Sequence, residues 1–374
     1  MIKNPAFWLI PVVIIFYLLS VGKPLLIPLV LAVFIWYLIH TLTGFFTKIP
    51  LGGRIRMPKP LAFCVSLVAI AASIYFASRV ITTNIVEVAA AAPAYQYNLE
   101  LMSRQLFAVI PWYEPLSISK LIADIDFGAT ARFAAREMTS IFGQGTFVLL
   151  YLLFIFLEQR SFGRKLIELI PNTGRQNKVN EIIRRIDLDV RTYLGIKTVA
   201  SVFTALLSYL IFLSIGLDFA GFWAFLIFLF NYIPTIGSIV ATVLPSLMAL
   251  VQYEGFGPFF IILIGVSIVQ LIISSVLEPR FMGDRLNVSP LVIVISLALW
   301  NKIWGIPGMI LCIPITSIGM IIFSHFPQTR MLAVALSRNG KLSESAFESA
   351  PPPEEFASAC DVEDEITEKP DARD

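Results

Sequence analysis

Apolar runs of about twenty residues recur along almost the whole of this 374-residue chain. A helix needs roughly 20 apolar residues to cross the hydrocarbon core of a bilayer, which is about 30 Å thick. Hydrophobic residues make up 57% of the sequence and charged residues only 14%, which excludes a soluble globular domain. The sequence therefore predicts an all-α polytopic membrane protein with about eight membrane segments. Six of them are the runs 5–21, 24–46, 60–81, 141–157, 194–215 and 258–277.

The stretch 221–250 is a seventh segment, and it is interrupted. Two short apolar runs are joined by Asn-Tyr-Ile-Pro-Thr-Ile-Gly at Asn231–Gly237. Pro234 has no N–H and crowds the carbonyl four residues back, and Gly237 tolerates backbone angles that other residues avoid. A helix entering from Phe222 should therefore break near Pro234 and restart after it. At membrane depth a broken helix survives only where protein or water covers its freed backbone groups, so the break is a candidate site.

The stretch 290–323 repeats this layout. About eleven apolar residues lead to Asn301, an Ile-Pro pair ends at Pro307, Gly308 follows, and about fifteen apolar residues come next. Each half, at 1.5 Å per residue, reaches ~17–23 Å, past the middle of a membrane but not across it. Two corresponding interrupted segments are the best indication that a sequence gives of a transporter binding site.

Two topologies fit these broken stretches. If both are re-entrant helical hairpins, a helix followed by a hairpin occurs twice, as an inverted repeat whose halves enter from opposite faces. If both are single kinked spans, the loop 278–287 lies on the outer face instead. That loop is neutral, so its charge does not decide between them. We expect hairpins, because a stretch of ~30–35 residues is long for one ~20-residue span.

Opposed half-helices create polar groups from which a site can be built. Helix N-termini present unpaired N–H groups and a positive dipole end, and C-termini present carbonyls. They could bind a small polar or anionic solute, or a cation at the carbonyls. A polar stripe at Ser267, Gln270 and Ser274 could line the path between the two breaks. The predicted substrate-binding residues are Asn231, Pro234, Thr235, Gly237, Ser267, Gln270, Ser274, Asn301, Gly305, Pro307 and Gly308.

A purely structural interpretation of these residues stays open. Asn231 and Asn301 could simply cap the broken helices. The stripe could simply hold helices together through polar contacts, which average less than ~1 kcal/mol in membranes.

Basic residues predict the orientation in the membrane. The loop 47–59 has four basic residues and no acidic one, and the segment 160–197 has nine basic against four acidic residues. Both are typical of cytoplasmic segments. Within the second, 176–193 is predicted to be an amphipathic helix on the inner surface, where anionic headgroups attract each nearby base by about 1 kcal/mol. The N- and C-termini are therefore predicted to be cytoplasmic.

These features divide the chain into five regions. Residues 82–140 form an extracytoplasmic amphipathic insertion, either a solvated helical cap or a lid over a substrate. From 343 onwards eleven acidic residues accompany two basic ones, which is typical of disorder. The regions are transmembrane helices 1–3 (1–81), the insertion (82–140), helix 4 with the cytoplasmic amphipathic helix and helix 5 (141–216), the two broken stretches flanking helix 7 (217–323), and the mostly disordered cytoplasmic tail (324–374).

The sequence offers little for catalysis. Cys64, Cys312 and Cys360 are scattered without metal-binding spacing, and His40 and His325 lie at helix ends, so we expect no metal, no cofactor and no enzyme. The basic segment 160–197 lacks aromatic interleaving, so we expect no nucleic-acid binding. A secondary transporter fits best, and a non-transporting membrane scaffold is the alternative.

Several stretches resemble the autoinducer-2 exporter family of bacterial permeases. The resemblance implies an oligomeric transporter of the bacterial inner membrane that exports a signalling molecule or another small polar solute, or else exchanges sodium for protons. It does not identify the solute, and it does not extend to the acidic tail. The stretches are Lys23–Ala32, Tyr193–Gly195, Asn231–Gly237, Glu278–Gly283, Ser289–Leu291 and Trp304–Pro314.

Overall fold

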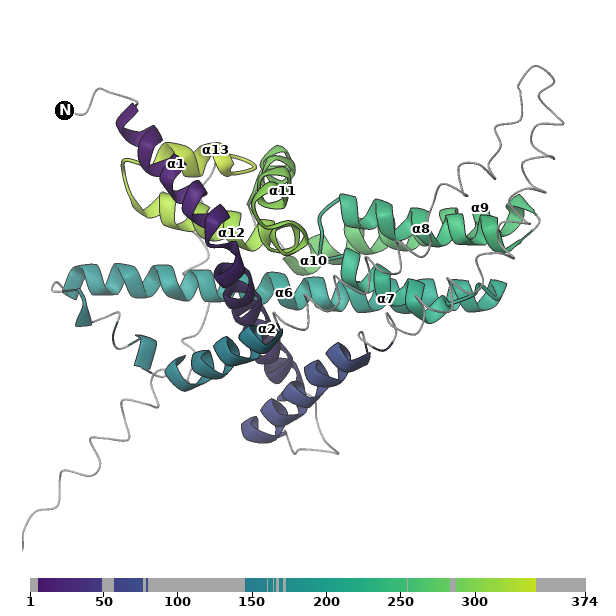
Figure 1. The fold of residues 1–374 in the computed structure, drawn as a ribbon. Coiled ribbons are helices and arrows are strands. Elements are labelled where there is room, and N and C mark those ends of the chain that lie inside the picture. The colour runs from purple at the N-terminus through teal and green to yellow at the C-terminus, as the bar shows by residue number, and fades with distance from the viewer. Residues whose placement is uncertain are drawn as a thin grey trace, which may run out of the picture.

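The computed structural model describes residues 6–48, 57–76, 79, 145–159, 161–163, 165, 168–170, 173–253, 255–282 and 287–340 (Figure 1). Within these residues all regular structure is helical, and one isolated antiparallel bridge joins Val288 to Ser337. The all-α fold is thus confirmed for the described part of the chain. The predicted insertion 82–140 and the acidic part of the tail lie outside it.

Among the described residues, five helices are long and apolar enough to cross a membrane. They are α2 (Lys23–Phe46), Lys59–Phe76, α6 (Thr173–Ile215), the segment Phe256–Phe281, and α12 (Ile306–His325). Shorter apolar helices are Gly145–Gln159, α7 (Ala220–Phe230), α8 (Ile236–Gln252) and α11 (Pro290–Trp304). The segment Phe256–Phe281 consists of α9 (Phe256–Ile272), a π-helical turn η1 (Ile273–Leu277) and most of α10 (Glu278–Met282). The remaining helices are α1 (Ala6–Val21) and α13 (Arg330–Leu336).

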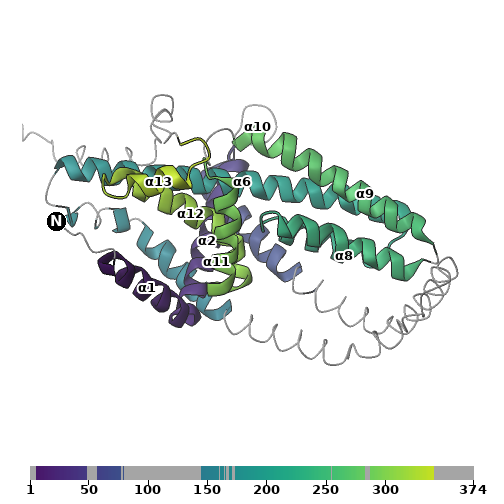
Figure 2. The same cartoon turned by 90° about the horizontal axis from the view of Figure 1, so that it is seen from above.

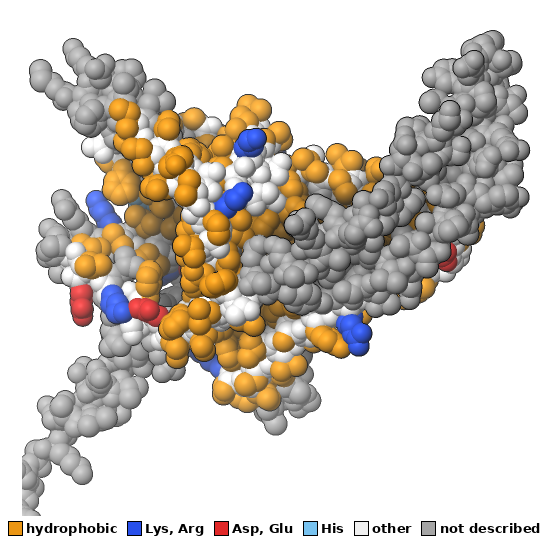
Figure 3. All heavy atoms as spheres, viewed as in Figure 1, with side chains coloured by type: hydrophobic (Ala, Val, Ile, Leu, Met, Phe, Trp, Pro, Cys, Tyr) orange, Lys and Arg blue, Asp and Glu red, His pale blue; other side chains and the backbone are white. Residues whose placement is uncertain are grey.

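The outside of these helices is apolar. Figure 3 shows hydrophobic side chains over most of the described surface on one face, with few charges among them. Leu149, Leu271 and Phe281 are each about two-thirds exposed. In water such a surface would be strongly unfavourable, whereas in lipid it costs nothing.

α1 and α2 meet at Gly22 without a loop. Gly22 keeps a right-handed helical backbone, its N–H donates to the carbonyl of Leu18, and its carbonyl accepts from the N–H of Leu26. The N–H missing from Pro24 weakens the helix there, and Figures 1 and 2 show the two helices joined at an angle. The chain bends at this point and does not reverse. The runs 5–21 and 24–46, predicted as two membrane segments, are thus joined as one bent helical stretch.

α6 is a single helix of 43 residues, about 65 Å long. The sequence predicted a surface helix over 176–193 followed by a separate span, but the two lie in one line. Tyr193 and Leu194 sit at the predicted junction and are buried against α2 and α12, which holds the helix straight there. Gly195 allows this close packing, because a Cβ on it would lie 3.0 Å from the Cγ2 of Thr41 in α2.

The chain reverses between α7 and α8. Beyond the end of α8, the Tyr253 hydroxyl donates to the carbonyl of Ile215 at 2.7 Å, and the Gln252 amide donates to the carbonyl of Gly216 at 3.0 Å. The end of α8 therefore lies beside the start of α7. Partial burial, and secondly the charge of Asp218, raises the pKa of Tyr253, which keeps its hydroxyl a donor. α7 and α8 form a helical hairpin that packs on one half of α6 (Figure 1).

α11 and α12 form a second hairpin. The hydroxyl of Ser296 in α11 lies 2.5 Å from that of Thr316 in α12, and Val288, just before α11, packs with Met320 near the end of α12. Since α9 starts beside the end of α6 and then runs back along it, α6 and α9 are antiparallel (Figure 2). Each of them is followed by a hairpin.

Candidate functional site

The first break is a tight and strained turn. α7 ends at Phe230, and α8 begins at Ile236. Thr235 between them has φ 59° and ψ −60°, in the left-handed half of the map, where a β-branched residue costs about 1–3 kcal/mol. Gly237 lies against the preceding helix so closely that a Cβ on it would be 1.8 Å from the carbonyl oxygen of Phe230. No other residue fits at 237 without moving backbone.

The second break has the same local construction. Gly305 separates α11 from α12 with φ 66°, and a Cβ on Gly308 would be 2.2 Å from the carbonyl oxygen of Trp300. In both breaks a glycine packs against the carbonyl of the aromatic residue that precedes an asparagine, Asn231 or Asn301. The sequence layout of the two stretches therefore corresponds to two similar turns.

The first break packs against the second hairpin through apolar side chains. Ile233 is 6% exposed and shares a buried cluster with Leu297 of α11 and Cys312 of α12. Phe230 and Trp300 pack at the edge of that cluster. Two stretches some seventy residues apart in the sequence are thus in contact, although the contact is apolar.

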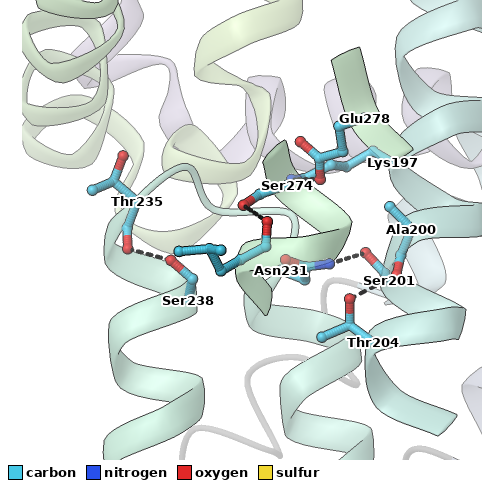
Figure 4. A network of polar contacts seen from close by, with 10 residues as sticks. Lys197, Ala200, Ser201, Thr204, Asn231, Thr235, Ser238, Ser274 and Glu278 are labelled. Carbon is cyan, nitrogen blue, oxygen red and sulfur yellow. Dashed lines mark hydrogen bonds and ion pairs between the residues drawn. The ribbon is translucent and has the colours of Figure 1, made fainter. Parts of the chain in front are cut away.

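The polar groups of the first break are directed to α6 (Figure 4). The Asn231 amide donates to the hydroxyl of Ser201 at 3.2 Å. The hydroxyl of Tyr232 lies 2.8 Å from that of Thr198. Both partners, Thr198 and Ser201, belong to α6, and Ser201 is fully buried.

An ion pair lies one helical turn from Ser201. The Lys197 ammonium donates to the Glu278 carboxylate at 2.6 Å, joining α6 to α10, and the two side chains are only 12% and 18% exposed. The sequence interpretation missed this pair. It counted Lys197 among the cytoplasmic bases and placed Glu278 at a helix end. The sequence did contain a signal for this pair. Two apolar helices run antiparallel, and each has one charge near the same end, Lys197 on one and Glu278 on the other.

The predicted stripe on α9 is divided. The Gln270 amide donates to the carbonyl of Ser238 at 3.1 Å and to the hydroxyl of Thr242 at 2.9 Å, which ties α9 to α8. Ser267 and Ser274 are exposed, and Ser274 bonds only within its own helix. Gln270 thus fits the alternative in which the stripe holds helices together.

The second break presents less polar surface to the first. Asn301 is exposed, and its side chain forms no hydrogen bond with any described residue. Pro307 is half-buried, and Trp304 is buried with its indole N–H donating to the carbonyl of Leu19 at the α1–α2 bend. Of the predicted residues, Asn231, Pro234, Thr235 and Gly237 lie together, while Asn301, Gly305, Pro307 and Gly308 form a separate turn.

In the described part of the chain, no three His, Cys, Asp or Glu side chains gather around one point. The geometry instead offers two broken helices in contact, with hydroxyls, an amide and one ion pair beside them. A model of the AI-2E family of transporters matches residues 8–328. The chain belongs to this AI-2E family. The resemblance read from the motifs is confirmed, and the acidic tail lies outside the match.

Individual AI-2E relatives agree in length as well as in sequence. The AI-2 transport protein TqsA of Escherichia coli K12 is 28% identical over 319 residues, which cover 84% of this chain and 89% of TqsA. A Haemophilus influenzae protein, named as a candidate transport protein, is 30% identical over 288 residues, covering 75% of this chain and 82% of its own. Together with the apolar helices, AI-2E membership identifies a multi-pass membrane transporter.

Proposed function

We propose that this AI-2E protein is a secondary transporter that exports a small polar solute or signalling molecule through a site between its two broken helices. The observation that carries the proposal is the packing of Ile233, in the first break, against Leu297 and Cys312 of the second hairpin. Broken backbone leaves donors and acceptors that need partners, and in transporters such breaks face the solute. The first solute to test is AI-2, because the relative TqsA is named for it.

The two hairpins are re-entrant in this proposal and form an inverted repeat. The reversals at both breaks and the antiparallel course of α6 and α9 support it. The protein lies in the bacterial inner membrane as a homo-oligomer with its C-terminus in the cytoplasm, and the basic first half of α6 contacts anionic headgroups. Transport shifts the hairpins as gated units, and the strained Thr235 marks where the first one bends.

Export of AI-2 from loaded proteoliposomes tests the proposal. We expect the wild-type protein to release AI-2 faster than protein-free liposomes do. Asn231→Ala and Asn301→Ala should each slow release by roughly tenfold, because a hydrogen bond to a passing solute is worth about 1.4 kcal/mol. Ser214→Ala, at the exposed end of α6 far from both breaks, should release AI-2 at the wild-type rate.

Two outcomes would count against this function. Wild-type rates in both asparagine variants would place the solute path elsewhere. No release by the wild-type protein would favour the scaffold alternative, in which the membrane domain only holds partners. Neither relative is named for cation exchange, so sodium/proton antiport has no comparable support.

The hairpin topology makes a separate prediction. If both stretches are re-entrant, Asn287 and Lys48 lie on the same, cytoplasmic side. In a variant without natural cysteines, Asn287→Cys and Lys48→Cys should both react with an impermeant maleimide only in inside-out vesicles. Labelling of Asn287→Cys from the opposite side to Lys48→Cys would rule out the inverted repeat and favour two kinked spans.

A further inference from the structure

The Lys197–Glu278 pair is more enclosed than two other ion pairs formed by described residues, Arg191–Asp187 and Lys165–Glu158. Its side chains are 12% and 18% exposed, against 37% and 36% for Arg191–Asp187 and 62% and 51% for Lys165–Glu158. Removing two charges from water costs several kcal/mol per ion, and the attraction between them recovers this only in good geometry. Stability alone is therefore a weak reason for such a pair between two apolar helices.

Hydrogen-bonding groups surround the pair. Thr198 and Tyr232 lie beside it with their hydroxyls 2.8 Å apart, and the hydroxyl of Ser201 lies one turn further along α6. The Tyr193 hydroxyl, one turn before Lys197 in α6, is buried without a hydrogen-bond partner among the described residues. A buried hydroxyl left unpaired costs about 1–3 kcal/mol, so this donor is available to a ligand.

Glu278 follows a segment that can rearrange. The five residues Ile273–Leu277 form a π-helical turn, and Glu278 begins the short α10 directly after it. π turns are rare, and they are frequently found at functional sites. Returning Ile273–Leu277 to α-helical geometry would rotate Glu278 about the helix axis, away from Lys197. The pair thus has a local means of opening that leaves α6 in place.

Resting on the proposed transport function, we propose that Lys197 is the anion-selective entrance to the site beside the first break, and that Glu278 closes it in this structure. Solutes carrying a carboxylate, phosphate or similar anionic group replace Glu278 at the Lys197 ammonium. The hydroxyls of Tyr193, Thr198 and Tyr232 then bind the polar remainder of the solute. A single cation in a low-dielectric wall concentrates anions and repels cations.

Charged thiol reagents test this entrance without knowledge of the solute. The reporter is Ser201→Cys, one turn beyond Lys197, in protein carrying Cys64→Ser, Cys312→Ala and Cys360→Ser and reconstituted in nanodiscs. The probes are the anionic sulfonatoethyl and the cationic trimethylammonium-ethyl methanethiosulfonates. We expect faster reaction with the anionic probe. Adding Glu278→Gln should raise the anionic rate about tenfold and leave the cationic rate nearly unchanged. Adding Lys197→Gln instead should remove the anionic preference.

A reporter outside the entrance serves as the control. Ser214→Cys, at the exposed far end of α6, should show the same ratio of anionic to cationic rates in all three backgrounds. Ser274→Cys, exposed in the π turn η1 one turn before Glu278, replaces the main reporter if Ser201→Cys does not fold.

Three results would overturn the entrance. They are equal acceleration of both probes by Glu278→Gln, no acceleration of either, and an anionic preference that survives Lys197→Gln. Since labelling needs no transport, the expected pattern in a protein that releases no AI-2 would uphold the entrance while contradicting the proposed function. AI-2 release without the labelling pattern would uphold the proposed function while contradicting the entrance.

Discussion

Replacing Gly237 by alanine should abolish transport and lower the melting temperature by roughly 10 °C or more, measured by scanning fluorimetry in detergent. The added Cβ would lie 1.8 Å from the Phe230 carbonyl oxygen and 3.1 Å from the Cβ of Ile233. The nearest atom is backbone, so no rotamer change can relieve the clash, and α8 must move away from α7. Overpacking that shifts backbone costs at least about 3 kcal/mol, and a kcal/mol corresponds to about 2–4 °C in a protein of this size class.

Gly308→Ala should have a similar effect on the second hairpin, because its Cβ would lie 2.2 Å from the Trp300 carbonyl oxygen. Each variant has a matched control in its own hairpin. Gly221→Ala in α7 meets no atom within 4 Å, and Gly319→Ala in α12 meets Phe323 at 3.9 Å, an ordinary contact. Both controls should melt at or above the wild-type temperature, since alanine favours helix over glycine by up to ~1 kcal/mol. A Gly237→Ala protein as stable and active as Gly221→Ala would disprove the tight turn.

Removing only the lysine of the Lys197–Glu278 ion pair should destabilise the protein nearly as much as Gly237→Ala does. Lys197→Met leaves the Glu278 carboxylate largely enclosed and without its cation, which costs about 3–5 kcal/mol and lowers the melting temperature by roughly 6–20 °C. Water screens little of this, because neither side chain is more than 18% exposed. Because the loss of stability comes from the unpaired Glu278 carboxylate, removing that carboxylate as well should restore the stability. In Lys197→Met with Glu278→Leu no charge remains to be desolvated, so stability should return to near the wild-type value.

The rescue separates stability from transport. If Lys197 binds the solute, the double variant melts normally and still exports nothing. If the pair only holds α6 to α10, stability and export return together. An undiminished melting temperature in Lys197→Met alone would show that the two groups are solvated and that the pair is not enclosed.

Both breaks could be predicted from the sequence because their causes are local. Pro234 and Pro307 lack an N–H wherever they stand, and Gly237 and Gly308 are the residues that allow close backbone approach. The contact between the breaks through Ile233 depends on how two distant hairpins pack, and no local pattern records it. The continuity of α6 was also unpredictable, since an amphipathic segment and an apolar segment look like two helices when nothing shows what buries Tyr193.

The ion pair was missed for a similar reason. Predicting it requires the antiparallel register of α6 against α9 and the π turn that sets the direction of Glu278. Counting residues at an α-helical period placed Ser274 on one stripe with Gln270. A π turn changes that period locally, and its sequence, Ile-Ser-Ser-Val-Leu, has no distinguishing residue. The stripe was therefore predicted as one surface, whereas Gln270 contacts α8 and Glu278, just beyond the stripe, contacts α6.

The length and straightness of α6 have a mechanical consequence. The helix crosses α2 at Gly195, close to its own midpoint, and it contacts the first break on one side of that crossing and α12 on the other. If α6 tilts as one rigid body, it pivots about this crossing. A tilt of about 5° moves each end of a 65 Å rod by roughly 3 Å, in opposite directions. A displacement of either hairpin that tilts α6 is thus transmitted to the other hairpin by α6.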